Sequence, residues 1–176
     1  MTLIFVVQSL RAPLSEKFVW LLTVFFFGAL PPILVLVYEK RKGKISDWFI
    51  SNRAERRDVQ LAWVFGATSV TALALIFDLP RTLQALSLTF FSLSLGMSVV
   101  NFYWKVSVHT AMITLAVLSM VLIYSSSWAF LFLLILFVAW ARVQVGAHTW
   151  SQTSGGVFLS LIITYFWFNY FGLATF

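Results

Sequence analysis

The stretch "SWAFLFLLILFVAWARVQVGAHTWSQTSGG", residues 127–156, decides the fold, because an unbroken apolar run leads directly into a polar loop. The run from Trp128 to Val145 is close to the roughly 20 residues that an α-helix needs to cross about 30 Å of hydrocarbon. Its one charged residue, Arg142, stands near the end of the run, and His148 follows in the loop. An arginine at that depth is costly unless it has a partner or a role. The stretch therefore predicts a membrane-spanning helix with candidate functional groups at its end.

The same pattern recurs along the whole chain. Its 176 residues are 61% hydrophobic and 10% charged, whereas a soluble domain is nearer half apolar and a quarter charged. Because unpaired backbone groups are not tolerated in lipid, each apolar segment is expected to be a helix. The prediction is an all-α fold, with residues 1–176 as one integral membrane domain, residues 1–17 as an interfacial segment, and Pro31 and Pro32 kinking the first helix. The six expected transmembrane helices are 18–38, 59–79, 83–104, 108–124, 128–145 and 156–171.

Basic residues gather in alternate loops, which share one membrane face in a six-helix bundle. That face is expected to hold both histidines, His109 and His148, and nine of the twelve lysines and arginines. The positive-inside rule favours a cytoplasmic position for this face, but cations needed for chemistry would weaken that bias. A +6 charge concentrated in one short loop suits anionic lipid headgroups better than nucleic acid. The nine residues are Lys40, Arg41, Lys42, Lys44, Arg53, Arg56, Arg57, Lys105 and Arg142.

Composition excludes several classes of site. The chain has no cysteine, which rules out disulfides and thiolate metal ligands. A magnesium-dependent prenyltransferase or alcohol phosphotransferase usually needs several carboxylates around a diphosphate. The six acidic residues are Glu16, Glu39, Asp47, Glu55, Asp58 and Asp78. They form no D-x-x-D cluster, and none of them lies in the centre of an expected helix. The sequence therefore predicts no metal or other cofactor. Nothing in the sequence predicts an oligomeric state.

The first loop, "KISDWFISNRAERR" (residues 44–57), offers cations for phosphate oxygens. Lys44 and Arg53 are the candidate phosphate ligands, with Arg57 as an alternative to Arg53. Asp47 either braces a loop arginine or belongs to the site. Taken alone, the loop is more typical of a solvated juxtamembrane segment that follows the positive-inside rule.

Two further motifs carry the histidines. In "KVSVHTA" (residues 105–111), Ser107, the backbone N–H of Val108 and His109 could present themselves to one anion at a helix N-terminus, although Ser107 could also be a simple helix cap. In "RVQVGAHTWSQ" (residues 142–152), Arg142 could bind an anion, His148 could attack or protonate, and Gln152 could orient its ring. The alternative for Arg142 is snorkelling.

Together the three motifs favour phosphoryl transfer through a phosphohistidine. One histidine attacks phosphorus and the other protonates the leaving oxygen. Fixed cations stabilise the charge on the phosphoryl oxygens.

The motifs resemble those of the type 2 phosphatidic acid phosphatase superfamily, K-x6-R-P, P-S-G-H and S-R-x5-H-x3-D. The third motif is kept best, as Arg142, five residues and His148. In the second, Val108 replaces the glycine. In the first, eight residues separate Lys44 from Arg53, and Ala54 replaces the proline. Gln152 replaces the final Asp, and "HTWSQ" is similar to the third motif of dolichyl diphosphatases.

The resemblance implies one membrane phosphatase domain with its active site at the helix ends on one face. It implies that His148 is the nucleophile, that His109 is the general acid, and that Lys44, Arg53, Ser107 and Arg142 bind phosphate. The implied activity is metal-independent hydrolysis of a lipid phosphate, with a polyprenyl diphosphate favoured over phosphatidate or phosphatidylglycerol phosphate. Relatives often work on the outer or luminal face, which favours that orientation here.

A small membrane transporter or scramblase is the non-enzyme alternative. It predicts ionisable or polar groups in mid-membrane, and the helix centres are almost free of ionisable groups. Asn101, near the site face, is expected to hydrogen-bond either a neighbouring helix or a lipid headgroup. Trp104, Trp140, Trp150 and Tyr103 are expected to form an aromatic belt at the same interface.

Overall fold

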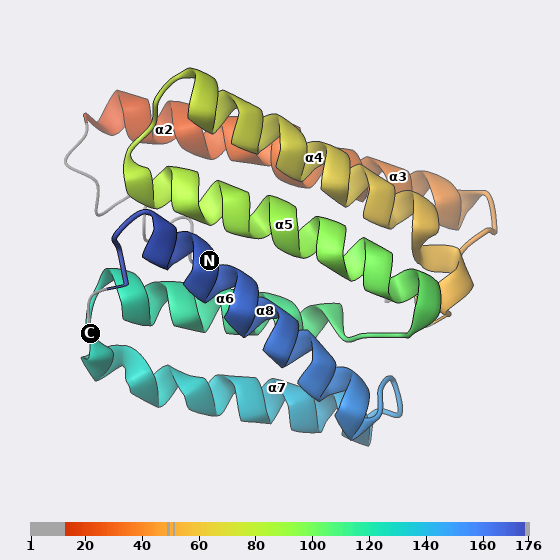
Figure 1. The fold of residues 1–176 in the computed structure, drawn as a ribbon. Helices are drawn as coiled ribbons and strands as arrows, with labels where there is room; N and C mark the ends of the chain where they lie inside the picture. The colour runs from red at the N-terminus through yellow and green to blue at the C-terminus, as the bar shows by residue number, and fades with distance from the viewer. Residues whose placement is uncertain (1–12, 49, 51, 175–176) are drawn as a thin grey trace.

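The computed structural model describes residues 13–48, 50 and 52–174, and all of the regular secondary structure in this part of the chain is helical. Consecutive long helices run in opposite directions across the molecule (Figure 1). The elements are α2 (Leu14–Thr23), η1 (Val24–Ala29), α3 (Leu30–Arg41), η2 (Arg53–Arg56), α4 (Arg57–Ile76), α5 (Arg81–Tyr103), α6 (Val108–Ile123), η3 (Ser126–Leu131), α7 (Phe132–Gln144) and α8 (Trp150–Tyr170).

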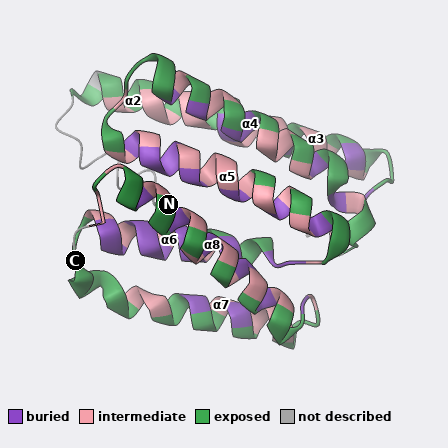
Figure 2. Ribbon diagram, viewed as in Figure 1, coloured by how far each residue is buried: buried purple, intermediate pink, exposed green. Residues whose placement is uncertain are grey.

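Four helices of the described residues are long and apolar enough to cross a membrane: Glu16–Arg41, Arg53–Ile76, Arg81–Tyr103 and Ser126–Gln144. The prediction of an all-helical membrane protein is therefore confirmed in its coarse form. The fourth predicted segment corresponds to α6, which has 16 residues, and the sixth to α8, which has 21. The faces of the helices that point outward are largely exposed, and buried positions face the centre (Figure 2).

The first helix combines α2, η1 and α3 without a break. Residues 1–12 of the expected interfacial segment lie outside the described residues, and Leu14–Lys17 belong to α2. The expected irregularity at Pro31 and Pro32 takes the form of the π-helical segment η1 just before them. Because neither proline has an N–H, the carbonyls four residues earlier lose their helical donors.

Those two carbonyls, of Phe27 and Gly28, face Gly66 on α4. A Cβ added at Gly66 would lie 2.7 Å from the Phe27 oxygen and 2.8 Å from the Gly28 oxygen. Only glycine therefore lets α4 approach the first helix this closely, and small residues are the usual means of close packing between membrane helices.

A stripe of small residues on α8 packs against α6. Gly156, Ser160 and Thr164 follow at four-residue spacing, and all three are buried. Residues four apart lie on one side of a helix, so the stripe forms one flat face. A Cβ at Gly156 would lie 2.5 Å from the Ser107 oxygen. The stripe thereby holds the beginnings of α6 and α8 against each other.

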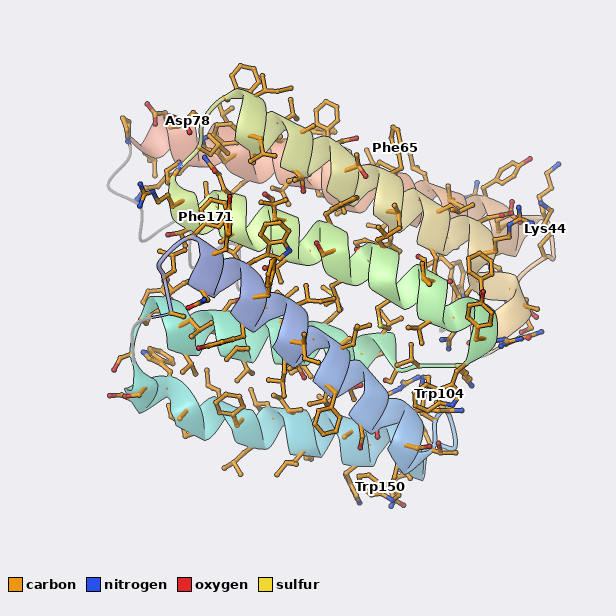
Figure 3. The ribbon with its side chains drawn as sticks, viewed as in Figure 1. Lys44, Phe65, Asp78, Trp104, Trp150 and Phe171 are labelled. Atoms are coloured by element: carbon orange, nitrogen blue, oxygen red, sulfur yellow. The ribbon has the colours of Figure 1, made fainter. Side chains whose placement is uncertain are left out.

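The four aromatic residues predicted to form a belt lie on the surface of the bundle. Tyr103, Trp104, Trp140 and Trp150 are all exposed. Trp104 and Trp150 lie at the same end of the bundle as Lys44, whereas Asp78 and Phe171 lie at the opposite end (Figure 3). Such residues mark the level of the lipid headgroups.

Candidate functional site

The candidate site lies at the end of the bundle where α4, α6 and α8 begin and α3, α5 and α7 end (Figure 1). Loops can be polar there because the backbone is no longer surrounded by hydrocarbon. The site is assembled from three connections that are far apart in the sequence.

The connection from α7 to α8 fixes His148. The Arg142 carbonyl accepts hydrogen bonds from the N–H groups of Ala147 (3.1 Å) and His148 (3.3 Å), and Gly146, at φ 67°, allows the tight turn. A capping box of Thr149 and Gln152 starts α8 immediately afterwards. His148 is 7% exposed, and its Nδ1 has no hydrogen-bond partner among the described residues.

The capping box also corrects the predicted start of the last helix. The apolar pattern of the sequence predicts a start at residue 156, but α8 begins at Trp150. The polar residues in the first turn of α8 hid the helix, because they lack the apolar periodicity of a membrane span. The signature of a threonine followed three residues later by glutamine was readable in the sequence.

The start of α6 is hydrogen-bonded directly to α8. The Ser107 N–H donates to the Gln152 carbonyl at 3.1 Å, and the Thr110 hydroxyl donates to the Thr153 carbonyl at 3.0 Å. Ser107 is fully buried and its Oγ accepts from the Thr110 N–H at 3.4 Å, so it caps α6, the alternative role considered for it. Val108 and His109 follow in the first turn and are exposed. The two histidines thus belong to helix ends that are bonded together.

Arg56 is the residue that sequence reasoning did not single out. It is 6% exposed; its Nε donates to the Ile50 carbonyl at 2.8 Å and its Nη1 donates to the Val106 carbonyl at 3.2 Å. These bonds tie the first loop to the start of α6. No spacing signal in the sequence separates Arg56 from Arg53 and Arg57, because Arg53 and Arg56 lie in the 3-10 turn η2, before the regular register of α4 begins at Arg57.

The charges of this cluster act on both imidazoles. Arg56 and Arg142 act on His109, and Arg56, Lys105 and Arg142 act on His148. Burial and these three cations lower the pKa of His148 to about 4, while the Gln152 side chain opposes the shift by hydrogen bonding to the ring. Burial and the two arginines also lower the pKa of Lys105. At neutral pH His148 is therefore a neutral base among cations.

Asp47 is the carboxylate whose charge acts on Arg56 and Lys105. Within the described residues, no three His, Asp or Glu side chains are placed to hold a metal ion. Three cations and one carboxylate give this end of the bundle an excess of positive charge. An anion would balance that charge, and burying like charges together is costly without one.

Lys44 and Arg53 lie elsewhere. Lys44 is 59% exposed and pairs with Glu39, Nζ to Oε2, at 3.0 Å, and this hydrogen bond raises the pKa of Lys44. Arg53 and Arg57 line a separate cavity between α4 and α5. Neither Lys44 nor Arg53 is among the charges that act on the histidines. The structure brings Arg142, His109 and His148 into one cluster and adds Arg56 and Lys105.

An apolar cavity of about 440 Å³ lies among the first helix, α4, α5 and α6. On α6, Met112 and Ala116 line it, and they follow His109 at spacings of three and seven residues, on the same face. On α4, Trp63 lines it, seven residues after Arg56. The cavity therefore lies on the helix faces that carry His109 and Arg56 at their ends.

No protein-family model, curated protein or solved structure matches this chain. The basis for a function is therefore the chemistry of the cluster, which combines a buried neutral imidazole, a second exposed imidazole and three cations.

Proposed function

We propose that the chain is a membrane lipid phosphatase that works through a phosphohistidine. The observation that carries the proposal is the cluster itself: His148, buried and neutral at pH 7, lies among the charges of Arg56, Lys105 and Arg142, two of which also act on His109. A neutral imidazole has a lone pair with which to attack phosphorus. Cations already held in place stabilise the negative charge of the transition state without reorganisation.

In the proposed reaction, a ring nitrogen of His148 forms a bond to phosphorus while the bond from phosphorus to the leaving oxygen breaks. Protonated His109 gives its proton to that oxygen. Water then attacks the phosphohistidine, His109 takes a proton from the water, and His148 is released with inorganic phosphate. Arg56, Lys105 and Arg142 hold the phosphoryl oxygens, so that Arg56 and Lys105 take the place first expected for Lys44 and Arg53. Gln152 positions the His148 ring.

The apolar cavity supports a lipid as the substrate. Its lining begins at Met112, one helical turn after His109, and at Trp63, two turns after Arg56, and it extends into the interior of the bundle. A hydrocarbon chain would be buried there while its phosphate stays at the helix ends. A polyprenyl diphosphate has one hydrocarbon chain and therefore suits a single cavity better than phosphatidate or phosphatidylglycerol phosphate, which have two acyl chains.

The proposed topology has six membrane-spanning helices with the site on one face. α6 has 16 residues, about 24 Å at 1.5 Å per residue, and it packs among α5, α7 and α8. Flanked in this way, it need not match the full bilayer thickness by itself. Without the three cluster cations, six cations remain on this face against three on the other, so the positive-inside rule still favours the cytoplasm, although less strongly. We place the site on the outer or luminal face because the lipid phosphatases that the motifs resemble often work there.

The test is phosphate release by the purified protein in detergent with a chelator present. Farnesyl diphosphate and dioleoyl phosphatidate are the substrates, and His148→Asn and His109→Asn are the variants. Activity should fall by at least 100-fold in both, within the range for loss of an acid–base catalyst or nucleophile. With ³²P-labelled substrate, wild type should form an acid-labile, base-stable adduct that His148→Asn cannot form.

Arg81→Gln, at the opposite end of the bundle, is the control and should retain activity and the adduct. Full turnover by either histidine variant, or an adduct formed without His148, would refute the proposed mechanism.

A further inference from the structure

A second cavity, of about 200 Å³, lies between α4 and α5 beside the candidate site. Arg53, Arg57 and Gln60 line it from η2 and α4, and Asn101 lines it from α5. The cations of this cavity are distinct from Arg56, which points to Ile50 and Val106. None of these residues belongs to the histidine cluster, so a ligand bound in this cavity would be separate from the proposed phosphatase reaction.

Two arginines give the cavity the chemistry of a phosphate site. Arg53 begins η2, Arg57 is the first residue of α4, and both line the cavity. Guanidinium groups form paired hydrogen bonds with phosphate oxygens. At the level of the lipid headgroups, the phosphate that is always available is that of a phospholipid.

Asn101 indicates which group a ligand should carry in addition to its phosphate. It is 7% exposed, and its Nδ2 donates to Gln60 Oε1 at 3.1 Å, as expected for a helix-to-helix contact. Its Oδ1 is buried and has no hydrogen-bond partner among the described residues. A buried acceptor without a donor is unfavourable, so a ligand that brings a hydroxyl donor would be stabilised here.

The cavity also opens onto the lipid-facing surface. Leu61 and Phe102 line it and are 51% and 64% exposed. An acyl chain that leaves the arginines would lie on these two side chains and continue into the bilayer. The ligand is thus amphipathic, with an anionic, hydroxyl-bearing head and a hydrocarbon tail.

We propose that this cavity binds an anionic phospholipid of the surrounding bilayer whose headgroup carries a hydroxyl donor, such as a glycerol headgroup. The phosphate binds Arg53 and Arg57, the headgroup hydroxyl donates to Asn101 Oδ1, and the tail lies along Leu61 and Phe102.

The test is native mass spectrometry of the full-length protein in detergent, titrated with one lipid at a time. Dioleoyl phosphatidylglycerol has the charge and the hydroxyl donor. Dioleoyl phosphatidylmethanol has the same charge without the donor, and dioleoyl phosphatidylcholine has neither. Wild type should bind phosphatidylglycerol about fivefold more tightly than phosphatidylmethanol, and this ratio corresponds to the free energy of one hydrogen bond.

The Arg53→Gln/Arg57→Gln variant should bind both anionic lipids about 25-fold more weakly than wild type, because each arginine contributes about fivefold to the affinity. Its affinity for phosphatidylcholine should be unchanged. Asn101→Ala should remove the preference for phosphatidylglycerol and leave phosphatidylmethanol binding unchanged. Arg41→Gln, an exposed arginine at the same end of the bundle, is the matched control and should bind like wild type.

Equal binding of phosphatidylglycerol and phosphatidylmethanol by wild type would overturn the role of Asn101, and this comparison needs no variant to fold. An effect of Arg41→Gln as large as that of the double variant would show diffuse attraction instead of a site. Unchanged binding by the double variant would overturn the proposal as a whole.

Discussion

Replacing Gly156 by alanine tests whether the contact between α6 and α8 positions the two histidines. The added Cβ would lie 2.5 Å from the Ser107 oxygen and 2.6 Å from Thr110 Oγ1. An ordinary contact begins near 3.4 Å, so the helix ends must separate by about 0.9 Å. Because Ser107 and Thr110 both hydrogen-bond to α8, this movement strains the bonds that join the two helix ends.

The expected loss of stability follows from three contributions. Overpacking costs about 1–3 kcal/mol. Loss of the two hydrogen bonds costs about 1 kcal/mol each. Alanine in a helix regains about 1 kcal/mol relative to glycine. The free energy of unfolding should therefore fall by about 2–4 kcal/mol. Activity per folded molecule should fall about 100-fold, the effect of a misplacement of roughly 1 Å at a catalytic centre.

Both effects can be measured on one detergent preparation, by thermal unfolding and by phosphate release. Gly96→Ala is the matched control, because its Cβ would meet Ile163 Cδ1 and Leu159 Cδ2 at an ordinary 3.7 Å. That variant should be as stable as wild type or slightly more stable, with full activity. If Gly156→Ala is destabilised but equally active per folded molecule, the packing argument stands and the positioning argument fails. If it behaves like Gly96→Ala, both fail.

Three further predictions concern the charges and the other close helix contact. The pKa of His148 falls from 6.5 to about 4 on folding, so the unfolded chain binds a proton that the folded chain does not bind as pH drops through this range. This contribution to the free energy of unfolding is complete above pH 6.5 and decreases by up to about 3 kcal/mol by pH 4. The free energy of unfolding should therefore fall more steeply across pH 4–7 in wild type than in His148→Asn. Lys105→Gln should raise the pKa of His148 and move the acid limb of the kcat/KM profile to higher pH, because it removes one of the cations that act on the ring. Lys44→Gln removes a cation that is paired with Glu39, and it should leave the acid limb unmoved. Equal shifts in the two variants would contradict the assignment of Lys105 to the cluster. Gly66→Ala should lower the free energy of unfolding by about 1–2 kcal/mol with KM unchanged, since its Cβ meets two backbone oxygens far from the site, and an unaltered melting curve would contradict the close approach of α4 to the first helix.

The positions of the helices could be predicted because hydrophobicity is the dominant requirement in a bilayer. Each of the six apolar segments corresponds to a helical stretch of the structure. The sixth was placed too late because its first turn is held by the capping box of Thr149 and Gln152 and is not apolar. The tight pairing of α6 and α8 had a signal in the small residues Gly156, Ser160 and Thr164, which sequence reasoning did not use.

The choice of cations could not be made from motif spacing alone. Three arginines lie within five positions at the start of α4, and a spacing pattern does not distinguish which of them points inward. In the structure Arg56 is buried against the Val106 carbonyl, whereas Lys44 is drawn to Glu39 five residues before it. Such local pairings depend on side-chain geometry in a loop, where neither apolar periodicity nor helix register restricts the chain. The lowered pKa of His148 depends on the same geometry, because it results from burial and from cations of three different connections.

The position of the cluster at the helix ends is consistent with a chain that is surrounded by a lipid bilayer. Within the bilayer, polar groups are costly unless paired, and each backbone carbonyl is held by its own helix. A reactive imidazole with an unpaired nitrogen and three cations can be accommodated only where helices end, which is also the level of lipid phosphates. The loop at His148 illustrates this arrangement. Gly146 turns the chain, the Arg142 carbonyl accepts from the N–H groups of Ala147 and His148, and the capping box starts the next helix. His148 Nδ1 has no hydrogen-bond partner among the described residues. In the proposed reaction, the pairing of α6 with α8 determines whether His109 reaches the phosphorus atom that His148 attacks. A single methyl group at Gly156 therefore tests the proposed site more severely than the removal of an exposed lysine.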